Sequence, residues 1–342
     1  MDIEHLNTKY FETLLMDISN ICNLRCPLCA RTKLKDKVKL QDTNLSFEIL
    51  EEILIKFPSI TKIELGHVMS EPLLHPNIIE IIRHLKGRYI NIFLPTNGSV
   101  QKDSVFWKEF MELLDENDQI VWAIDGLSQE TYQQYRIGGK LDSVLKNFFQ
   151  AYQFNPRVQH NIQTIEFKHN INELFPKDIK GKTTKTTKTS KNFHKFKEEI
   201  LKRIEYFGLI PGNLNIYTIP CCENVNFKNK STNEVEPLWD KNKWEEIKDS
   251  PFLKNQTIRC SSIISKDIYI DHVGRIRLCG DHYTDNPLDT EAPTIEDSIE
   301  KIDSYIKNTY QNRFSNKICN YTCGAKSKLK RNIYGIPIEG KI

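Results

Sequence analysis

The sequence has no long apolar run and no strong excess of charge of either sign. No apolar stretch approaches the roughly 18 residues that a membrane-spanning helix requires. The first residues, MDIEHLNTKYFETLLMD, carry acids where a secretory signal peptide carries bases. The formal net charge is only +3, from 48 basic and 45 acidic side chains, which argues against an extended nucleic-acid-binding face. These absences predict a cytoplasmic protein with neither a membrane nor a nucleic acid as partner.

Cysteine, by contrast, is abundant, with nine residues. In a reducing compartment disulfide bonds are a poor explanation for so many thiols. Three of the cysteines lie within residues 22–29, and the other six lie beyond residue 220. Cysteines clustered in this way in a reduced protein indicate metal binding.

Short apolar runs alternate with helical patterns over the first two-thirds of the chain. Strands are expected at residues 14–18, 62–65, 89–94, 120–124, 161–167 and 214–219. Strands that alternate with helices at this spacing predict a parallel sheet with helices outside it. About six such units are too few for a closed eight-stranded barrel. We therefore expect an α/β fold, a partial (β/α)6 TIM-like barrel over residues 10–220, followed by a small α+β iron–sulfur domain over residues 221–342.

A low-complexity segment interrupts the barrel pattern. Residues 178–192 read DIKGKTTKTTKTSKN and have no apolar side chain after the isoleucine. Such a stretch buries too little surface to offset its ordering entropy. It is predicted to be a flexible surface insertion, and an arm that contacts phosphate or RNA is the alternative.

The first three cysteines, Cys22, Cys26 and Cys29, form a C-x3-C-x2-C motif directly after the first expected strand. A four-iron cluster normally takes four thiolates, so three on one loop leave one iron open. An open iron can chelate a small molecule through an amine and a carboxylate. Zinc and three unrelated cysteines are the alternatives, although zinc sites usually pair two C-x2-C hairpins.

This motif resembles the hallmark of the radical S-adenosylmethionine (radical SAM) superfamily, with Leu28 where an aromatic residue is usual. The resemblance implies that the three cysteines bind a 4Fe-4S cluster and that S-adenosyl-L-methionine (SAM) binds the open iron. It further implies reductive cleavage of SAM to a 5′-deoxyadenosyl radical, which abstracts hydrogen from a substrate. The electron would come from an external reductant that resembles flavodoxin or ferredoxin.

Later strand ends resemble further parts of the same family pattern. They are the segment after the second strand with its Glu-Pro pair (66–76), the Thr-Asn-Gly turn (96–98) and the segment IDGLSQETYQQYRIGG (124–139). The resemblance implies cofactor contacts from Gly66, Ser70, Glu71, Asn97, Asp125, Ser128 and Arg136. The alternatives are a solvated loop acid at Glu71, and a capped helix with surface ion pairs at Ser128 and Arg136.

The second cysteine group lies near the carboxyl end. Cys260 and Cys279 frame a C-x13-G-x4-C pattern around Gly274, with two short strands between them, and Cys319 and Cys323 follow. The four thiolates are enough to close a cluster. The arrangement resembles the SPASM domain, in its shorter twitch form, which implies an auxiliary 4Fe-4S cluster. Zinc is the alternative.

The expected activity is that of a radical SAM oxidoreductase or maturase. The substrate would be a small molecule, such as a sugar or alcohol, or a peptide. Because the cysteine triplet starts at residue 22, no leader-binding segment is expected before the barrel, which favours the small molecule. Two alternatives remain, an RNA-modifying radical SAM enzyme and a non-catalytic iron–sulfur or zinc protein. The sequence identifies neither the substrate nor the role of Cys221 and Cys222.

Overall fold

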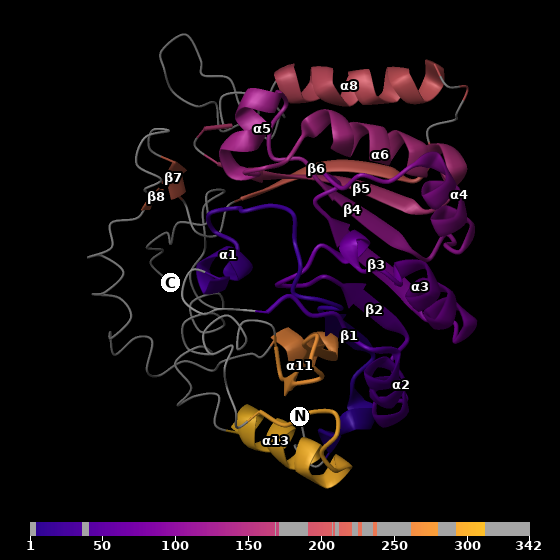
Figure 1. The fold of residues 1–342 in the computed structure, drawn as a ribbon, viewed down its shortest axis with the longest axis vertical. Coiled ribbons are helices and arrows are strands. Elements are labelled where there is room, and N and C mark those ends of the chain that lie inside the picture. The colour runs from indigo at the N-terminus through magenta and orange to yellow at the C-terminus, as the bar shows by residue number, and fades with distance from the viewer. Residues whose placement is uncertain are drawn as a thin grey trace, which may run out of the picture.

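A single parallel sheet forms the centre of the molecule. The computed structural model describes residues 5–35, 41–167, 169–170, 191–206, 208, 212–220, 225–227, 235–237, 261–279 and 292–311. Six parallel strands follow one another in the sheet, namely β1 (Thr13–Met16), β2 (Lys62–Leu65), β3 (Asn91–Thr96), β4 (Gln119–Ala123), β5 (Gln159–Glu166) and β6 (Leu214–Pro220). They confirm the six strands expected from the sequence (Figure 1).

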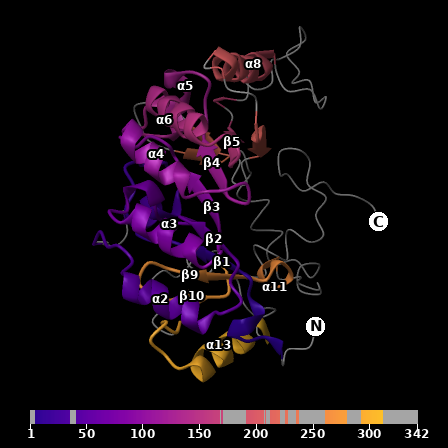
Figure 2. The ribbon, with the colours of Figure 1, turned by 90° about the vertical axis from the view of Figure 1, so that its right-hand side faces the viewer.

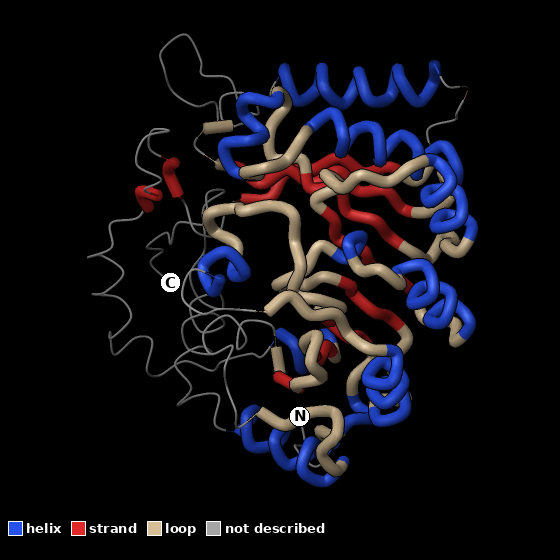
Figure 3. Tube along the Cα trace, viewed as in Figure 1, coloured by secondary structure: helices blue, strands red, loops and turns tan. Residues whose placement is uncertain are grey.

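Helices cover one face of this sheet. The covering helices are α2 (Phe47–Lys56), α3 (Ile78–Gly87), α4 (Ser104–Glu112), α5 (Gln129–Tyr135), α6 (Leu141–Phe154) and α8 (Lys191–Tyr206). Figure 2 shows α2, α3, α4 and α6 on the same side of the strands, and Figure 3 shows the helices around the outside of the sheet. Alternate residues of β1, β2 and β3 are buried, as expected when only one face packs on helices. The other face is left for the loops and the pocket described below.

The expected helix after the first cysteines illustrates how local sequence sets an element. Ser46 caps α2 by accepting a hydrogen bond from the backbone N–H of Ile49. The buried residues Leu50, Ile53 and Leu54 share the face that packs on the sheet. The sequence over residues 47–57 indeed has its apolar residues at helical spacing.

The segment after residue 260 extends the barrel sheet. It contains α11 (Ser261–Ser265), β9 (Asp267–Ile270), β10 (Ile276–Arg277) and, further on, α13 (Ile299–Gln311). β9 runs parallel to β1, with Thr13 opposite Asp267, and β10 pairs with β9 in antiparallel orientation. The two predicted strands and their turn at residues 272–274 are therefore confirmed, but their attachment to β1 was not predicted.

The sheet has the strand order β10-β9-β1-β2-β3-β4-β5-β6, so its two end strands do not pair with each other among the described residues. The prediction of a partial, open barrel is confirmed. β7 (Val225–Phe227) and β8 (Val235–Pro237) form a separate antiparallel pair. Pro220, at the predicted domain boundary, ends β6, and the residues directly after it (221–224) lie outside the described part. The 178–192 insertion also lies outside it, except that Lys191 and Asn192 begin α8. No helix in the described part combines the length and apolar character needed to cross a bilayer.

A histidine lies inside the core. His160 on β5 has no exposed surface. Its Nδ1 accepts a hydrogen bond from Trp122 Nε1 at 3.2 Å, and its Nε2 donates to the carbonyl of Asn155 at 3.3 Å. This pattern uses both ring nitrogens of a neutral imidazole. Burial lowers the pKa of His160 from 6.5 to about 4.

This histidine predicts a loss of stability at mildly acidic pH. Between about pH 6.5 and about pH 4 the unfolded chain binds a proton at this site and the folded chain does not, so the free energy of unfolding falls as the pH falls. The full effect is about 3 kcal/mol. Urea titrations between about pH 7.5 and about pH 5 should show a shallower pH dependence for His160→Gln than for the wild type. His5→Gln, at an exposed position, should keep the wild-type slope; equal slopes in all three proteins would contradict the prediction.

Candidate functional site

A pocket of about 650 Å³ lies on the open face of the sheet, where the parallel strands end. Its wall includes all three cysteines of the triplet. It also includes residues from the loops or inner faces of β1 to β5 and from the β9–β10 hairpin. Among the predicted cofactor residues, the wall contains Gly66, Ser70, Glu71, Asn97 and Arg136. The topology therefore gathers at one place residues that are spread over more than a hundred positions of the chain.

The cysteine loop joins β1 to α1 (Ala30–Lys35) and is braced by a loop from another unit. The N–H of Arg25 donates to the carbonyl of Ile137 at 3.0 Å, and the N–H of Cys29 donates to the carbonyl of Cys26 at 3.1 Å. Cys26 also packs in a small apolar cluster with Leu24, Tyr135 and Phe167. The segment after α5 therefore holds the loop that carries the thiols.

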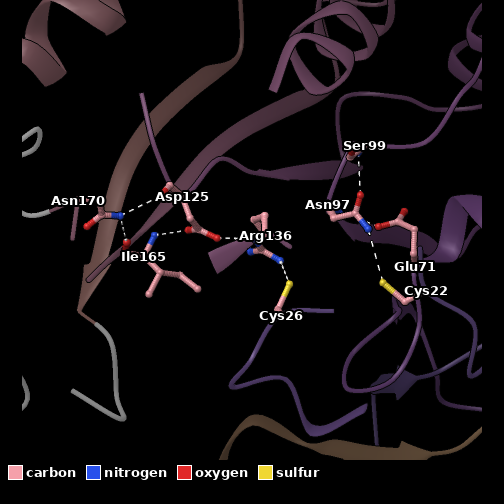
Figure 4. Close-up of polar contacts among 9 residues, drawn as sticks. All are labelled: Cys22, Cys26, Glu71, Asn97, Ser99, Asp125, Arg136, Ile165 and Asn170. Carbon is pink, nitrogen blue, oxygen red and sulfur yellow. Dashed lines mark hydrogen bonds and ion pairs between the residues drawn. The ribbon is translucent and has the colours of Figure 1, made fainter. Parts of the chain in front are cut away.

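Hydrogen-bond donors point at two of the three sulfur atoms. Asn97 Nδ2 lies 3.6 Å from Cys22 Sγ, and the N–H of Leu24 lies 3.5 Å from the same sulfur. The guanidinium of Arg136 lies 3.8 Å from Cys26 Sγ. Figure 4 shows the contact of Asn97 with Cys22 and that of Arg136 with Cys26. Such donors are among the groups that tune the potential of iron–sulfur clusters.

Cys22 and Cys26 lie in surroundings that disfavour the thiolate form unless a positive charge is close by. Burial raises the pKa of the Cys22 thiol to about 12, and the negative charge of Glu71 adds to this rise. Burial also raises the pKa of Cys26, although the nearby Arg136 opposes the rise. Bound iron ions would supply the compensating charge, because a coordinating thiol is deprotonated by its metal.

The arrangement of the three cysteine ligands suits a cluster better than a single metal ion. Within the described residues, no three His, Cys, Asp or Glu side chains converge on the position of a single metal ion. The ligands of a four-iron cluster each bind a different iron, so they surround the cluster and do not meet at one point. Three thiols on one loop, all lining one pocket and two of them contacted by N–H donors, fit such a cluster.

Glu71 connects three strand ends and is buried, with only 2% of its surface exposed. Its Oε1 accepts from Thr96 Oγ1 at 2.6 Å, its Oε2 accepts from the N–H of Asn97 at 2.7 Å, and its own N–H donates to the carbonyl of Ile21 at 2.8 Å. Burial raises the pKa of Glu71, against the lowering effect of these hydrogen bonds. The alternative of a solvated loop acid does not describe this residue.

Asp125 and Arg136 form a buried ion pair beside Cys26. Arg136 Nε donates to Asp125 Oδ2 at 2.5 Å, and Asp125 has no exposed surface. The second carboxylate oxygen accepts from the N–H of Ile165 at 2.6 Å, and Asn170 donates to the carbonyl of Asp125 at 3.0 Å (Figure 4). Arg136 is therefore not part of a surface ion pair. Arg136 lines the pocket, and its ion pair with Asp125, which does not line the pocket, fixes the position of the guanidinium.

Two residues predicted to contact the cofactor, Ser128 and Asp125, are not among those that line the pocket. Ser128 caps α5 by accepting from the N–H of Thr131 at 3.1 Å and is not among the residues that line the pocket. Its contact with the cofactor stays a prediction, as does a direct contact from Asp125.

Gly66 has a φ of +83°, and a Cβ there would lie 2.8 Å from Pro72 Cδ, so this turn requires glycine.

Several pocket residues were not recognised from the sequence. Gln163, His67 and Asp267 line the pocket, although none of the three was among the residues expected to contact the cofactor. Burial, together with the charge of Glu64, raises the pKa of Asp267 to about 6. Asp17 was also missed; it lies behind the wall of the pocket and organises the loop after β2. Its neighbours in sequence give no sign of that role.

Of the second cysteine group, Cys279 is described, and it lines the same pocket as the triplet. The other three predicted ligands, Cys260, Cys319 and Cys323, lie outside the described residues. Cys221 and Cys222, whose role the sequence left open, lie outside them too. The auxiliary cluster therefore stays a prediction.

The family model of the Radical SAM superfamily matches residues 16–162, from the end of β1 into β5 and including the cysteine triplet. Residues 16–162 therefore match a radical SAM domain. A protein of that superfamily would be an enzyme that binds a 4Fe-4S cluster and SAM. The prediction of a SPASM or twitch domain after the radical SAM domain is not tested by this match.

A curated relative matches part of the chain. Over 100 residues the chain is 33% identical to the tungsten-containing aldehyde ferredoxin oxidoreductase cofactor-modifying protein of Pyrococcus furiosus. The match covers 29% of this chain and 27% of that protein, so it spans about a quarter of the relative's length.

Solved structures share the fold at low sequence identity. Streptococcus suis SuiB aligns over 86% of this chain and 66% of its own, with a TM-score of 0.46 and 16% identity. SuiB bound to precursor peptide SuiA aligns over 93% of this chain and 72% of its own, with a TM-score of 0.50 and 15% identity. BtrN in complex with AdoMet and 2-DOIA aligns over 91% and 92%, with a TM-score of 0.44 and 11% identity. At such identities the likeness concerns the fold.

Proposed function

We propose that this chain cleaves SAM reductively and uses the resulting radical to abstract hydrogen from an organic substrate. The observation that carries the proposal is the convergence of Cys22, Cys26 and Cys29 with Glu71 and Arg136 on one pocket. These residue types can bind a cluster with one open iron and, beside it, a molecule that carries an amine and a carboxylate. When bound, a 4Fe-4S cluster supplies the electron that breaks a C–S bond of SAM.

The chain's own residues orient the cofactor. The guanidinium of Arg136 offers a two-pronged contact to a carboxylate, and its ion pair with Asp125 fixes its direction. Glu71 and the backbone of residues 66–70 offer oxygen acceptors for a protonated amine. The apolar cluster of Leu24, Tyr135 and Phe167 around Cys26 keeps water from that side of the site.

A second cluster is proposed at Cys260, Cys279, Cys319 and Cys323. The position of Cys279 in the wall of the pocket supports it, because a cluster bound there would lie beside the substrate. A group in that place suits acceptance of the substrate electron or direct binding of the substrate. An external protein of the flavodoxin or ferredoxin type would supply the first electron.

The substrate is proposed to be a polar small molecule or a peptide. Gln163, His67 and Asp267 line the pocket and can bind hydroxyl, amine or amide groups. The fold shared with SuiB, which has been crystallised with a precursor peptide, supports the peptide as the second candidate. Assigning either substrate to this chain requires turnover of that substrate.

Anaerobic reconstitution with iron and sulfide, followed by reduction in the presence of SAM, tests the proposal. We expect 5′-deoxyadenosine and methionine in equal amounts, measured by chromatography, because cleavage of one C–S bond releases both. We also expect added SAM to change the electron paramagnetic resonance spectrum of the reduced protein. A protein with its full iron content that gives neither result would be a non-catalytic iron–sulfur protein, and zinc in place of iron would exclude the proposed chemistry.

A further inference from the structure

One buried carboxylate organises the loop that follows β2. Asp17 directly follows β1 and has no exposed surface. Its Oδ1 accepts from the N–H groups of Val68 at 3.1 Å, Met69 at 2.9 Å and Ser70 at 3.2 Å. The hydroxyl of Ser70 donates to the same oxygen at 3.2 Å. Three consecutive N–H groups therefore converge on one negative charge, an arrangement known as an anion-binding nest.

The other oxygen of Asp17 connects the loop to the hairpin beyond residue 260. Tyr269 on β9 donates its hydroxyl to Asp17 Oδ2 at 2.6 Å. Tyr269 is fully buried, packs with Met69 and has its ring centroid 5.8 Å from that of His67. Both the hydroxyl and the ring of Tyr269 therefore contact the group formed by Asp17 and this loop.

The geometry of the peptide bond gives this arrangement a consequence for the pocket. The N–H and C=O groups of a trans peptide point in opposite directions. Since the N–H groups of Val68, Met69 and Ser70 point at Asp17, the carbonyls of residues 67–69 are turned away from it. Residues 66–71 line the pocket and Asp17 does not. The carboxylate thus fixes the loop with its acceptor groups available to the cofactor.

We propose that Asp17 and Tyr269 are positioning residues for SAM, and that the β9 hairpin sets the shape of the SAM-binding loop through them. The inference rests on the proposed function, because it concerns the same site. Tyr269 acts through Asp17 and touches no part of SAM. The expected effect of its hydroxyl is therefore on cofactor affinity, with iron content and folding left as they are.

The test compares two phenylalanine variants. Tyr269→Phe removes the hydroxyl that contacts Asp17. Tyr10→Phe removes a hydroxyl that donates to the carbonyl of Ile263 at 2.8 Å, which also connects the amino-terminal part to the region after residue 260 but does not reach the loop. Each protein is reconstituted anaerobically; iron, sulfide and thermal midpoint are measured, and SAM is titrated against the spectrum of the reduced protein.

We expect Tyr269→Phe to bind SAM about tenfold more weakly, as the loss of a hydrogen bond to a charged group predicts. Its iron content should remain at the wild-type value, and Tyr10→Phe should bind SAM like the wild type. Asp17→Asn should weaken binding more, because it also disturbs the three N–H contacts. The double variant Asp17→Asn/Tyr269→Phe should bind SAM like Asp17→Asn alone, since the hydroxyl acts through the carboxylate.

Any of three binding results would overturn the inference. They are an unchanged SAM affinity in Tyr269→Phe, equal weakening in Tyr10→Phe, and additive effects in the double variant. Loss of iron or of the folded state in Tyr269→Phe would assign a structural role and overturn it too. If Asp17→Asn does not fold, the two phenylalanine variants still decide. A wild-type protein that binds no SAM would refute the proposed function itself, and the inference with it.

Discussion

Replacing Cys22, Cys26 and Cys29 together by alanine is expected to reduce 5′-deoxyadenosine formation to the level of a protein-free control. Without the three thiolates the cluster that would offer an open iron to SAM has no protein ligands. The variant should lose about four irons and about four sulfides. Since the second cysteine group is unaffected, about four irons should remain if it binds a cluster. Chromatography of the nucleoside and iron and sulfide analysis measure both effects.

A matched variant separates the two sites. Cys279→Ala alters the proposed auxiliary site while leaving the triplet intact. It should keep the spectral change caused by SAM but lose part of the iron. Continued turnover in the triple variant would contradict the assignment of the triplet. Zinc in that variant, in place of the remaining iron, would contradict the auxiliary cluster.

The local parts of the site were predictable from the sequence. The three thiols lie on one short loop, so their spacing alone brings them together. Glu71 and Arg136 were found because the order of strand-end segments matches the family pattern. Helices can also be found from local signals; for example, residues 141–152 have the apolar spacing of a helix, and α6 is observed at Leu141–Phe154. In each case a few neighbouring residues carry the information.

The remaining parts depend on contacts between distant residues. Asp17 is a single acid after a strand, and its partners are N–H groups 51 to 53 positions along the chain and a hydroxyl 252 positions along. A backbone N–H has no sequence signature, so this arrangement could not be predicted. The attachment of β9 to β1 is indicated by one feature of the sequence. Ile268, Tyr269 and Ile270 are all buried, and a continuous apolar run is typical of a strand covered on both faces.

The structure also bears on the alternatives that the sequence left open within residues 124–139. Ser128 is the N-cap residue of α5, as the alternative of a capped helix stated. Arg136 at the other end of that helix points inward, to Asp125. The two ends of α5 lie in different environments. The ion pair of Arg136 with the buried Asp125 shows that the carboxyl-terminal end of the helix faces the pocket. The argument for Arg136 therefore rests on its partner as much as on its motif.

The second large effect is expected on replacement of Arg136. Arg136→Met leaves the Asp125 carboxylate buried without its cation, and breaking a buried pair in this way costs about 3–5 kcal/mol of stability. The same change removes the guanidinium that is proposed to hold the carboxylate of SAM. Urea unfolding should therefore show a large loss of stability, and SAM titration should show weaker binding.

The double variant Asp125→Asn/Arg136→Met distinguishes these two contributions. Neutralising Asp125 removes the uncompensated charge, so much of the lost stability should return. SAM affinity should not return, because the guanidinium is still missing. Arg136→Lys, which keeps the charge but not the two-pronged geometry, should fold and bind SAM at an intermediate affinity. Recovery of affinity in the double variant would mean that Arg136 supports the fold alone and that the carboxylate of SAM is bound by another group.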